Sequence, residues 1–530
     1  MVNRSLKASS VSTPAPVGGL NDRDSIAAMP PTDALILENW FPSTNSVDVR
    51  GGSIQYATGL PSVGESLMAY NASASSKLFA ASGGNIYDAT AGGTIGAAVV
   101  SGKSNSRWDY VNFGNNGGHY LVAVNGTDLP MFYNGSTWTP SGTGYATAIT
   151  DALSILTSAA LFSQVAVWMN RLFFVEKNSL RCWYLPTQAI GGAASMLDFS
   201  GLAKLGGHLV AVCSVSTTAG VTLGDHLVAI TSNGECFVYS GTDPSSSTTF
   251  SLVGSYRMGP PLANGTDSQG GRFLTKFGAN VIAITQDGFT ALQDLISNDV
   301  VAQRVTISNK IINTVTNDTS QYINNFGWQI ILCSAQNKLI INVPTGVDTT
   351  SYQYVMNTIT NAWCKFTGWN ATCFEIWNGL IYAIIGTSIY QVDVDNQNDF
   401  VTSSYAGNPI TALAKTAFQY VGGASRYKFF TMARAMIYAS DAITPIVNIN
   451  TNLTDYPIQG NEIVGNANSS YWGTAIWGTS LWSSENVPSF KWVGVSGDGY
   501  NVALKLQVIT NNQYCKWQAW DIQFMQGGLL

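Results

Sequence analysis

The sequence predicts an all-β fold, with a β-propeller-like domain of about six blades and a β-rich platform domain formed by the N-terminal arm and the C-terminal region. Two observations predict this fold. Charged residues make up 11% of the 530 residues, well below the roughly 25% of average globular proteins. Gly, Ser, Thr and Asn carry the polar share instead, and these residues favour turns and hairpin loops. In addition, short apolar runs separated by turns recur along the middle of the chain.

The recurring unit is clearest in HLVAITSNGECFVY from His226 and NVIAITQDGFTAL from Asn280. Copies align at intervals of about 42 to 58 residues, close to the ~40–50 residues of WD and kelch blades. Asn-Gly and Asp-Gly pairs at Asn125, Asn233 and Asp287 stand where two-residue hairpins need positive φ. A set of isolated hairpins in a sandwich is the alternative. Seven copies favour an array, and five to seven blades are compatible with it. The aligned anchor residues are Leu78, Leu121, Leu172, Leu227, Val281, Leu339 and Ile381.

Composition divides the chain into three parts. Residues 1–64 form an N-terminal arm interrupted by Pro and Gly, and its Trp40 and Phe41 predict docking on the platform, because such a cluster is costly to leave in water. Residues 65–400 form the β-propeller-like domain. Residues 401–530 lose the repeated unit but keep a strand-like alternation, which predicts the C-terminal β platform domain.

Two segments depart from this pattern. Apolar residues on one helical face of TISNKIINTVTN, from Ile307 to Val315, predict a short inserted helix. Trp472, Trp477 and Trp482 are five residues apart, so neighbours would point to opposite faces of a strand. This segment is either a strand buried on both faces or an aromatic-rich loop at an interface, and we favour the loop.

Charge and cysteine content restrict the function classes. The net charge is −6, so the chain has no basic field for sequence-specific DNA binding, although a conduit through which DNA slides stays possible. The seven cysteines show no C-x-x-C spacing and are interpreted as small buried apolar residues. This interpretation fits a chain that folds in a reducing cytoplasm. No apolar run approaches 18 residues, so no membrane span is expected.

The sequence carries little that indicates catalysis. The three histidines, His119, His208 and His226, form no metal-ligand spacing. The acidic run from Asp393 to Asp399 partly follows a calcium loop, but it has Asn398 and Ser404 where an EF-hand needs Gly and Glu, so a polar inter-domain linker is favoured. The Asp-Gly at Asp498 is interpreted as a hairpin turn. We therefore expect no enzyme, no catalytic, cofactor-binding or metal-binding residues, and no cofactor.

Several longer stretches carry a family likeness. The run from Pro14 to Gly52, the segments RLFFVEKNSLRCWYLP and ECFVYSGTDPSSSTTFSLVGSYRMGPPL, and the closing KWQAWDIQFMQGGLL resemble the tail nozzle (tail tube, packaged-DNA stabilisation) proteins of short-tailed bacteriophages. The resemblance spans nearly the whole chain. Its motifs combine turn residues with structural aromatics, so it brings no catalytic residues.

The resemblance implies a structural virion protein of the tail, assembled in the cytoplasm of the bacterial host. Six copies would form a nozzle that extends and closes the DNA channel below the portal and adaptor rings and permits genome ejection. Its partners would be the adaptor (head-to-tail connector) ring, tail fibre or spike proteins, and passing double-stranded DNA without sequence recognition. The alternative is a carbohydrate-binding tail spike or fibre protein.

Overall fold

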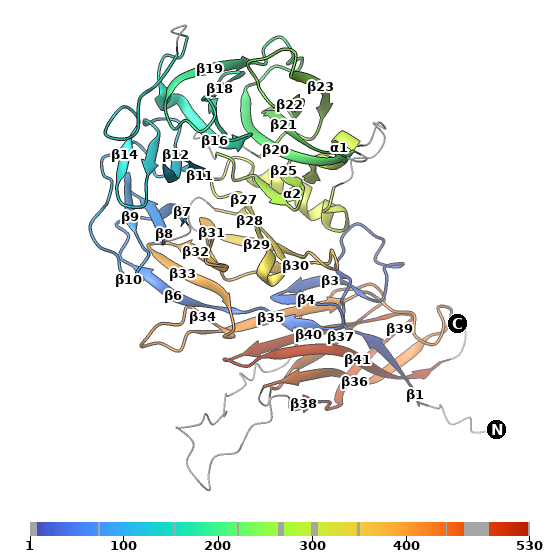
Figure 1. Ribbon diagram of the computed structural model, residues 1–530. Helices are drawn as coiled ribbons and strands as arrows, with labels where there is room; N and C mark the ends of the chain where they lie inside the picture. Colours follow the sequence, from blue (N-terminus) through green and yellow to red (C-terminus); the bar gives the residue numbers. More distant parts are fainter. Residues whose placement is uncertain are drawn as a thin grey trace, which may run out of the picture.

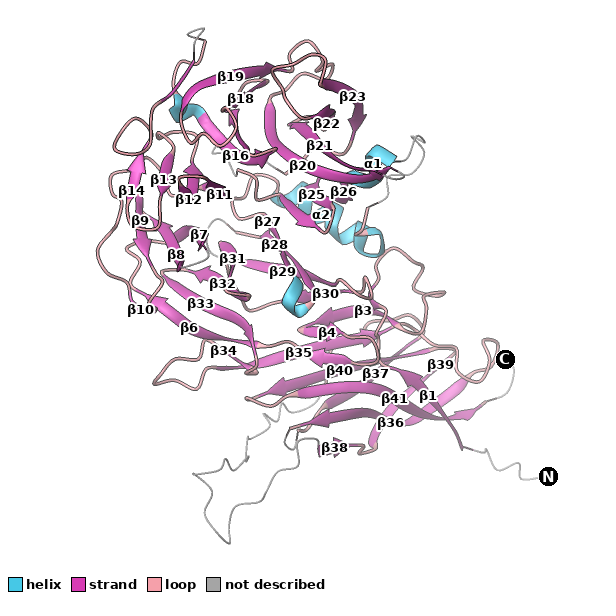
Figure 2. Ribbon diagram, in the orientation of Figure 1, coloured by secondary structure: helices cyan, strands magenta, loops and turns pink. Residues whose placement is uncertain are grey.

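The computed structural model describes residues 8–72, 75–151, 155–219, 222–262, 270–297, 306–346, 350–440, 443–459 and 487–527. The fold is all-β, as the sequence predicted, and consists of a propeller and a platform (Figures 1 and 2). Trp472, Trp477 and Trp482 lie outside the described residues, so the choice between strand and loop stays a prediction. No helix in the described part has the length and apolar character needed to cross a lipid bilayer.

Seven sheets, counted over the described residues, follow one another around a common axis (Figure 1). We number them as blades 1 to 7. Neighbouring blades contact each other through their innermost strands or the strands next to them, and blade 7 contacts blade 1. The ring is therefore closed, and it has one blade more than the central expectation of six.

Blades 1 to 4 are antiparallel sheets built from consecutive strands. A short parallel strand, β15 (Ile149–Asp151), extends blade 3 at its outer edge. The strands are β7 (Gly64–Ala72), β8 (Ser75–Ser82) and β9 (Asn85–Asp88) in blade 1; β11 (Asp109–Asn115), β12 (Gly118–Val124), β13 (Met131–Tyr133) and β14 (Trp138–Pro140) in blade 2; β16 (Phe162–Trp168), β17 (Arg171–Glu176), β18 (Arg181–Tyr184) and β19 (Gly192–Asp198) in blade 3; and β20 (Leu209–Ala219), β21 (Thr222–Thr231), β22 (Glu235–Gly241) and β23 (Phe250–Arg257) in blade 4.

Blades 5 to 7 complete the ring. Blade 7 takes its outer strand, β6 (Gly52–Thr58), from the N-terminal part of the chain. The short strand β10 (Gly93–Thr94) pairs with β6. The other strands are β24 (Leu274–Phe277), β25 (Asn280–Thr285) and β26 (Gly288–Ala291) in blade 5; β27 (Gln329–Cys333), β28 (Lys338–Pro344), β29 (Ser351–Asn357) and β30 (Trp363–Phe366) in blade 6; and β31 (Cys373–Trp377), β32 (Leu380–Ile385) and β33 (Ser388–Val394) in blade 7.

The repeat anchors identified in the sequence each lie in the second strand of a blade, from Leu78 in β8 to Ile381 in β32. Each of these side chains is at most 2% exposed. The second strand of a blade is covered on both faces by neighbouring blades and is flanked by strands on both edges. This position gives the strongest apolar signal, which explains why the repeat was visible there.

Two of the three predicted pairs lie at hairpin connections, although neither pair forms a two-residue turn by itself, because the connection at Asn233 has three residues and Gly288 already belongs to β26. Gly234 (φ 83°) lies in the turn between β21 and β22, and Gln286 and Asp287 form the two-residue connection between β25 and β26. The pair at Asn125 instead lies in a longer loop between β12 and β13. There the Gly126 N–H donates to the Phe162 carbonyl, so this pair links blade 2 to blade 3.

The helical expectation near residue 310 is confirmed. A 3-10 turn (Asn309–Ile311) leads into α2 (Ile312–Tyr322), and Ile311 and Val315 are buried. The helix continues beyond the predicted segment. Among the described residues there is one further α-helix, α1 (Leu292–Ser297), and 3-10 turns at Ala159–Leu161 and Ser334–Gln336.

The platform consists of two packed sheets. One continues blade 6, because β3 (Asp33–Glu38) pairs with β30 through Glu38 and Lys365, and β35 (Asn408–Thr416), β40 (Val502–Thr510) and β37 (Ile446–Thr451) follow. Short strands β2 (Gly19–Leu20) and β34 (Asn398–Asp399) pair at its sides. The second sheet contains β1 (Ala8–Pro14), β4 (Trp40–Pro42), β5 (Val47–Val49), β36 (Lys428–Ala439), β38 (Val487–Ser489), β39 (Val493–Gly499) and β41 (Cys515–Gln526).

The N-terminal segment lies on the platform only as far as β5. Trp40 packs against Trp517 with ring centroids 5.8 Å apart, and both side chains are fully buried. Beyond Gly51 the chain enters blade 7, so the division at residue 64 does not match the path of the chain. A Cβ atom at Gly52 would lie 2.0 Å from the Asn398 carbonyl oxygen, and this crossing therefore requires glycine.

Candidate functional site at the propeller axis and the platform joint

The propeller axis is crossed by the segment just before β24. The Gly271 N–H donates to Asp109 Oδ1 of blade 2 (2.8 Å). The Arg272 guanidinium donates to the Glu65 carbonyl (2.7 Å) and to Ser66 Oγ (2.5 Å), both in blade 1. Blade 5, which this segment enters, is adjacent to neither blade 1 nor blade 2. The segment therefore spans the centre of the ring and closes it at this level. We call Gly270, Gly271 and Arg272 the axial segment.

Around the axial segment, side chains of one blade accept hydrogen bonds from the backbone of the next. The acceptor lies in the innermost strand of its blade, and the donor lies at or near the start of the following innermost strand. This repeated geometry links five of the seven neighbouring pairs of blades: 1 and 2, 2 and 3, 3 and 4, 6 and 7, and 7 and 1. The five bonds are Trp108 N–H to Ser66 Oγ (2.8 Å), Val165 N–H to Asp109 Oδ2 (3.0 Å), Val212 N–H to Gln164 Oε1 (3.1 Å), Phe374 N–H to Gln329 Oε1 (2.7 Å) and Leu67 N–H to Cys373 Sγ (3.3 Å).

We call these five acceptors the inter-blade ring. Its two glutamines also donate, Gln164 to the Val212 carbonyl (3.2 Å) and Gln329 to the Phe374 carbonyl (2.8 Å). Each amide thus satisfies both backbone groups of one residue in the next blade, as a neighbouring strand would. Buried peptide groups need such partners, and the inter-blade ring supplies them where the sheets are too far apart to pair.

A cavity of about 300 Å³ adjoins the axial segment. Val111, Val165, Val212 and Val281 from four successive blades give it apolar walls, with Asp109 and Gly271 among its other lining residues. The cavity is the remaining part of the propeller channel, and the axial segment lies at its boundary.

Two carboxyl groups near the axis have raised pKa values. Burial raises the pKa of Asp109 to about 6, although the N–H groups of Val165 and Gly271 and the charge of Arg272 favour its ionised form. Burial likewise raises the pKa of Glu375 to about 7, against a hydrogen bond from Tyr110. Both groups therefore change protonation near neutral pH, which makes the centre of the propeller sensitive to pH.

Arg50 occupies the joint between platform and propeller. Its Nη1 and Nη2 donate to the two carboxylate oxygens of Asp399 (2.9 and 2.5 Å), and its Nε donates to Asn39 Oδ1 (2.9 Å). The remaining donors reach the carbonyls of Gly51 (2.8 Å) and Thr367 (2.7 Å). The guanidinium is buried, and all five of its N–H groups have acceptors.

An indole completes the joint. The ring of Trp369 lies 4.3 Å from the Arg50 guanidinium carbon, and its Nε1 donates to Asp399 Oδ1 (2.8 Å). The contacts join the residues that directly follow β3 and β5 to β34 and to the loop between blades 6 and 7. Since one residue contacts segments of both parts, the joint holds the propeller and platform as one unit.

The acidic run from Asp393 to Asp399, which partly follows the pattern of a calcium loop, contributes one carboxylate to this joint and another to a second ion pair. Asp399 pairs with Arg50, and Asp393 pairs with Lys338 and accepts the Gly51 N–H (3.0 Å). In the part of the chain that the structure describes, no group of three or more His, Cys, Asp or Glu side chains is placed to hold a metal ion. The linker interpretation fits this use of both carboxylates.

The other candidate residues are dispersed. His119 lies exposed in β12, His208 precedes β20 and His226 lies in β21, so the histidines belong to two blades. Asp498 is the last but one residue of β39 and accepts a hydrogen bond from the Tyr427 hydroxyl. Its turn was predicted to be a hairpin, but β39 pairs with β36 and the next strand, β40, pairs in the other platform sheet. The turn therefore connects two sheets.

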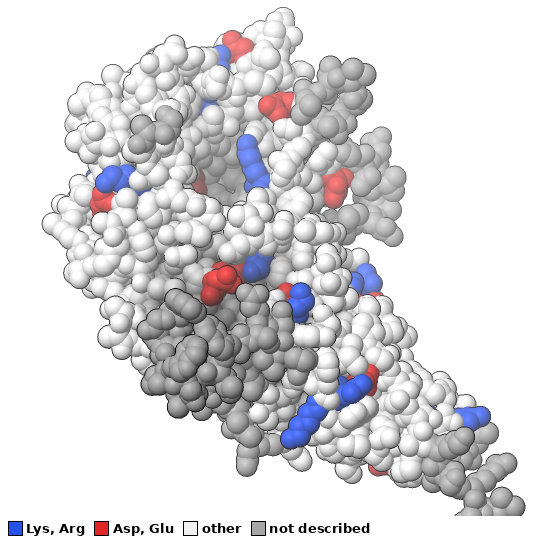
Figure 3. Space-filling view, turned by 60° about the horizontal axis from the view of Figure 1, so that its bottom comes forward, with Lys and Arg blue, Asp and Glu red and all other residues white. Residues whose placement is uncertain are grey.

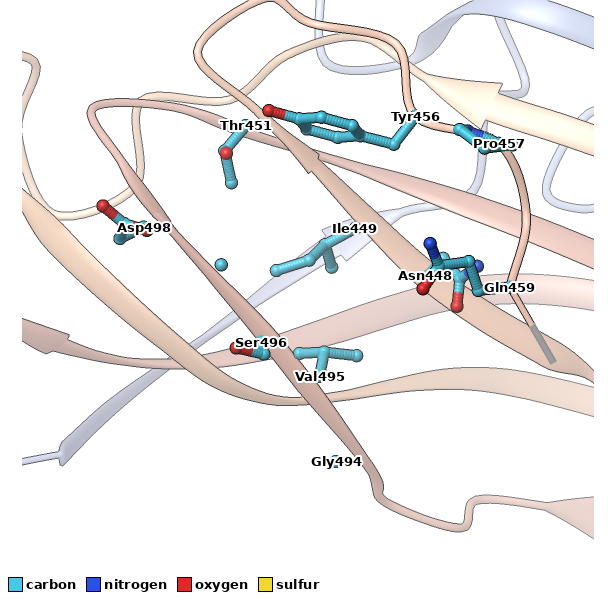
Figure 4. A pocket seen from close by; sticks show the side chains of 11 residues that line it. Asn448, Ile449, Thr451, Tyr456, Pro457, Gln459, Gly494, Val495, Ser496 and Asp498 are labelled. Atoms are coloured by element: carbon cyan, nitrogen blue, oxygen red, sulfur yellow. The ribbon is translucent and has the colours of Figure 1, made fainter.

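An open groove of about 450 Å³ lies between β37 and β39 on the platform (Figure 4). Five consecutive residues of β39, 494–498, line it, facing Asn448 and Ile449 of β37. Tyr456 and Pro457 lie along its upper side in Figure 4, and Gln459 lies beside Asn448. A pocket on one face of a strand would be lined by alternate residues, so this groove exposes the edge of β39.

Comparison with known proteins adds little beyond the fold. No protein-family model matches the chain, and no curated protein matches it. Solved structures similar to it are BBS1N in complex with ARL6DN, soaked with mercury (14% identity, 46% of this chain and 73% of that chain, TM-score 0.29), and YCF48 from Cyanidioschyzon merolae (12% identity, 64% and 97%, TM-score 0.35). Both are propeller proteins. At these values the likeness carries no argument about function.

Proposed function

We propose that the chain is the nozzle subunit of a short-tailed bacteriophage tail, a structural virion protein rather than an enzyme. Six copies form a ring that extends the DNA channel below the portal and adaptor, closes it in the virion and opens for genome ejection. The sequence resemblance from Pro14 to the closing KWQAWDIQFMQGGLL motivates the proposal. Its localisation is the virion tail after assembly in the host cytoplasm.

The observation that carries the proposal is the closed propeller axis. The axial segment and the inter-blade ring close the centre of the propeller at one level, and Arg272 bridges to Glu65 and Ser66 of blade 1. A polymer therefore has no path along this axis. If the chain forms a DNA conduit, the conduit must lie between subunits, and this is the arrangement of a ring.

The sparse charge of the surface supports the same function. Lys, Arg, Asp and Glu side chains are scattered on the face shown in Figure 3, most of which is uncharged. Phosphate binding by a basic surface increases with the number of Lys and Arg contacts. A surface with few such contacts leaves double-stranded DNA free to slide, without recognition of its sequence.

The rigid joint suits a part that transmits force between rings. In the nozzle, the platform faces the adaptor ring and tail fibre or spike proteins attach around the propellers. A tilt of the platform would be passed to the propeller, because Arg50 and the continuous sheet through Glu38 and Lys365 connect the two parts.

Mass photometry and negative-stain microscopy of the full-length recombinant chain test the proposal. We expect a ring of six subunits, and gold-labelled antibodies against the chain should bind at the tail of purified virions. A chain that stays monomeric at micromolar concentration and is absent from particles would overturn the proposal. A trimer that binds host glycans would select the alternative, a tail spike or fibre protein.

A further inference from the structure

Within the described ranges, the platform sheet that contains β36 and β41 has an unpaired edge on each side. In one half of this sheet the strand order is β39, β36, β41, β1. Among the described residues, β39 pairs only with β36, and β1 pairs only with β41. Both outer strands have seven residues. Exposed edges of this length are templates for further strand pairing.

The direction of the strands permits one specific continuation. All three pairings in this half of the sheet are antiparallel, so β1 runs opposite to β39. In a ring whose axis runs along the strands, rotation brings β1 of one subunit beside β39 of the next with that opposite direction kept. The junction is then a further antiparallel pair, and the contact is heterologous, as a closed ring requires.

The two edges also match in chemistry. β1 has the sequence ASSVSTP, which carries no charge, and most of its residues are exposed. β39 presents residues 494–498 to the groove. Its charged residue, Asp498, is hydrogen-bonded by Tyr427. A Cβ atom at Gly494 would meet nothing within 4 Å, which leaves room for a neighbouring backbone.

The middle of β39 is partly released from its own sheet. Gly497 pairs with Phe430 and Gly494 with Met432, so Val495 and Ser496 face the single residue between those two partners. This is a β-bulge, which leaves an extra residue outside the ladder. The bulge lies within the groove of Figure 4, where an added strand would contact it.

We propose that β1 of one subunit adds to β39 of its neighbour, so that this platform sheet continues around the ring. The proposal rests on the proposed function, since it specifies how the subunits of the nozzle join. The occupant of the groove edge is thus a second copy of this chain. Main-chain hydrogen bonds hold it, as in other cases of strand addition.

Disulfide trapping in the full-length chain tests the contact. Three variants pair Ser496→Cys with Ser9→Cys, Ser10→Cys or Ser12→Cys, because adjacent antiparallel strands bring Cα atoms within the 4.4–6.8 Å range of a disulfide. The native cysteines should not form disulfides under these conditions. Six are buried, and burial raises the pKa of the half-buried Cys213 to about 12.

Under mild oxidation, at least one pair should give a covalent ladder up to the full ring on a non-reducing gel, reversed by dithiothreitol. Each single-cysteine variant is a matched control and should give no ladder, because a heterologous contact keeps like edges apart. Rings that assemble normally but resist trapping at all three positions would overturn the inference while leaving the nozzle intact, and the groove would then fit a strand from another protein. A chain that never forms rings would overturn both.

A charge exchange tests the same contact without oxidation. Where Ser10 and Ser496 are the pair that crosslinks, Ser10→Lys combined with Ser496→Lys should reduce ring formation at least ten-fold, since like charges then face each other across the junction. Ser10→Glu combined with Ser496→Lys should restore it. If Ser9 or Ser12 crosslinks instead, that residue takes the place of Ser10. Equal assembly of the two double variants would contradict the proposed pairing.

Discussion

The Arg50 guanidinium and the Asp399 carboxylate form a bidentate ion pair where the platform meets the propeller, with N–O distances of 2.9 and 2.5 Å. The two residues are 349 positions apart. The pair has additional contacts with Asn39 and Trp369. A buried, fully hydrogen-bonded pair of this kind is costly to break, because removing one partner leaves an uncompensated charge.

Replacing Arg50 with Ala should therefore lower the free energy of unfolding by about 3–5 kcal/mol. Urea unfolding followed by tryptophan fluorescence measures this change. The matched control is Arg23→Ala, because Arg23 forms an exposed pair with Asp24. Such surface pairs contribute little to stability, because water screens both charges. Equal effects of the two substitutions would contradict the role assigned to the joint.

Loss of a glutamine from the inter-blade ring should weaken the closed propeller. Gln329→Ala leaves the N–H and carbonyl of Phe374 without their partners, which should cost about 1–3 kcal/mol for each buried group left unpaired. Differential scanning calorimetry should show a lower Tm. Gln518→Ala, at an exposed position in β41, is the control and should leave the Tm unchanged.

The carboxyl groups at the axis predict a pH dependence of stability. The pKa values of Asp109 (about 6) and Glu375 (about 7) lie above the values near 4 expected in the unfolded chain. Between pH 4 and 7 the folded state therefore binds more protons. Stability should rise as the pH falls from 8 to 5, by up to about 1.4 kcal/mol per pH unit for each group.

Glu375→Gln separates this contribution from the rest of the chain. The amide keeps an oxygen that can accept the Ile376 N–H, but it cannot titrate. Its pH profile of unfolding, measured between pH 5 and 8, should be flatter than that of the parent chain. A profile with the parent slope would show that Glu375 does not carry the effect.

Closure of the ring should depend on β6. Ala57 is fully buried and pairs with Ile389 in blade 7. Ala57→Asp places an unpaired charge in this core and should cost at least about 3 kcal/mol. Limited proteolysis should then cut within blade 7. Ile54→Asp, on the same strand but 37% exposed, should remain resistant; cleavage of both variants would argue against a specific role of the buried position.

The sequence predicted those strands and helices that have a short-range apolar pattern. The anchors from Leu78 to Ile381 located one strand in each blade, because the second strand is apolar in every copy. The helix containing Val315 was also visible, since its apolar residues share one face. The blade count was less certain, because blade 7 takes β6 from a segment that the composition assigned to the arm.

The contacts that close the axis could not be predicted in the same way. Ser66, Asp109 and Gln164 differ in type, and each stands alone near the start of its strand. No spacing rule connects them, because their common property is a position relative to the axis. The joint is a similar case, since the pairing of Arg50 with Asp399 depends on the path of the chain between two domains.

The conduit between subunits is the central claim. A cryo-EM map of the tail, or of the recombinant ring with double-stranded DNA, tests it most directly. We predict six copies around a central channel, with DNA between the propellers and the axis of each propeller filled by residues 270–272. DNA density along the axis of a single propeller, or a chain without ring symmetry, would contradict the account.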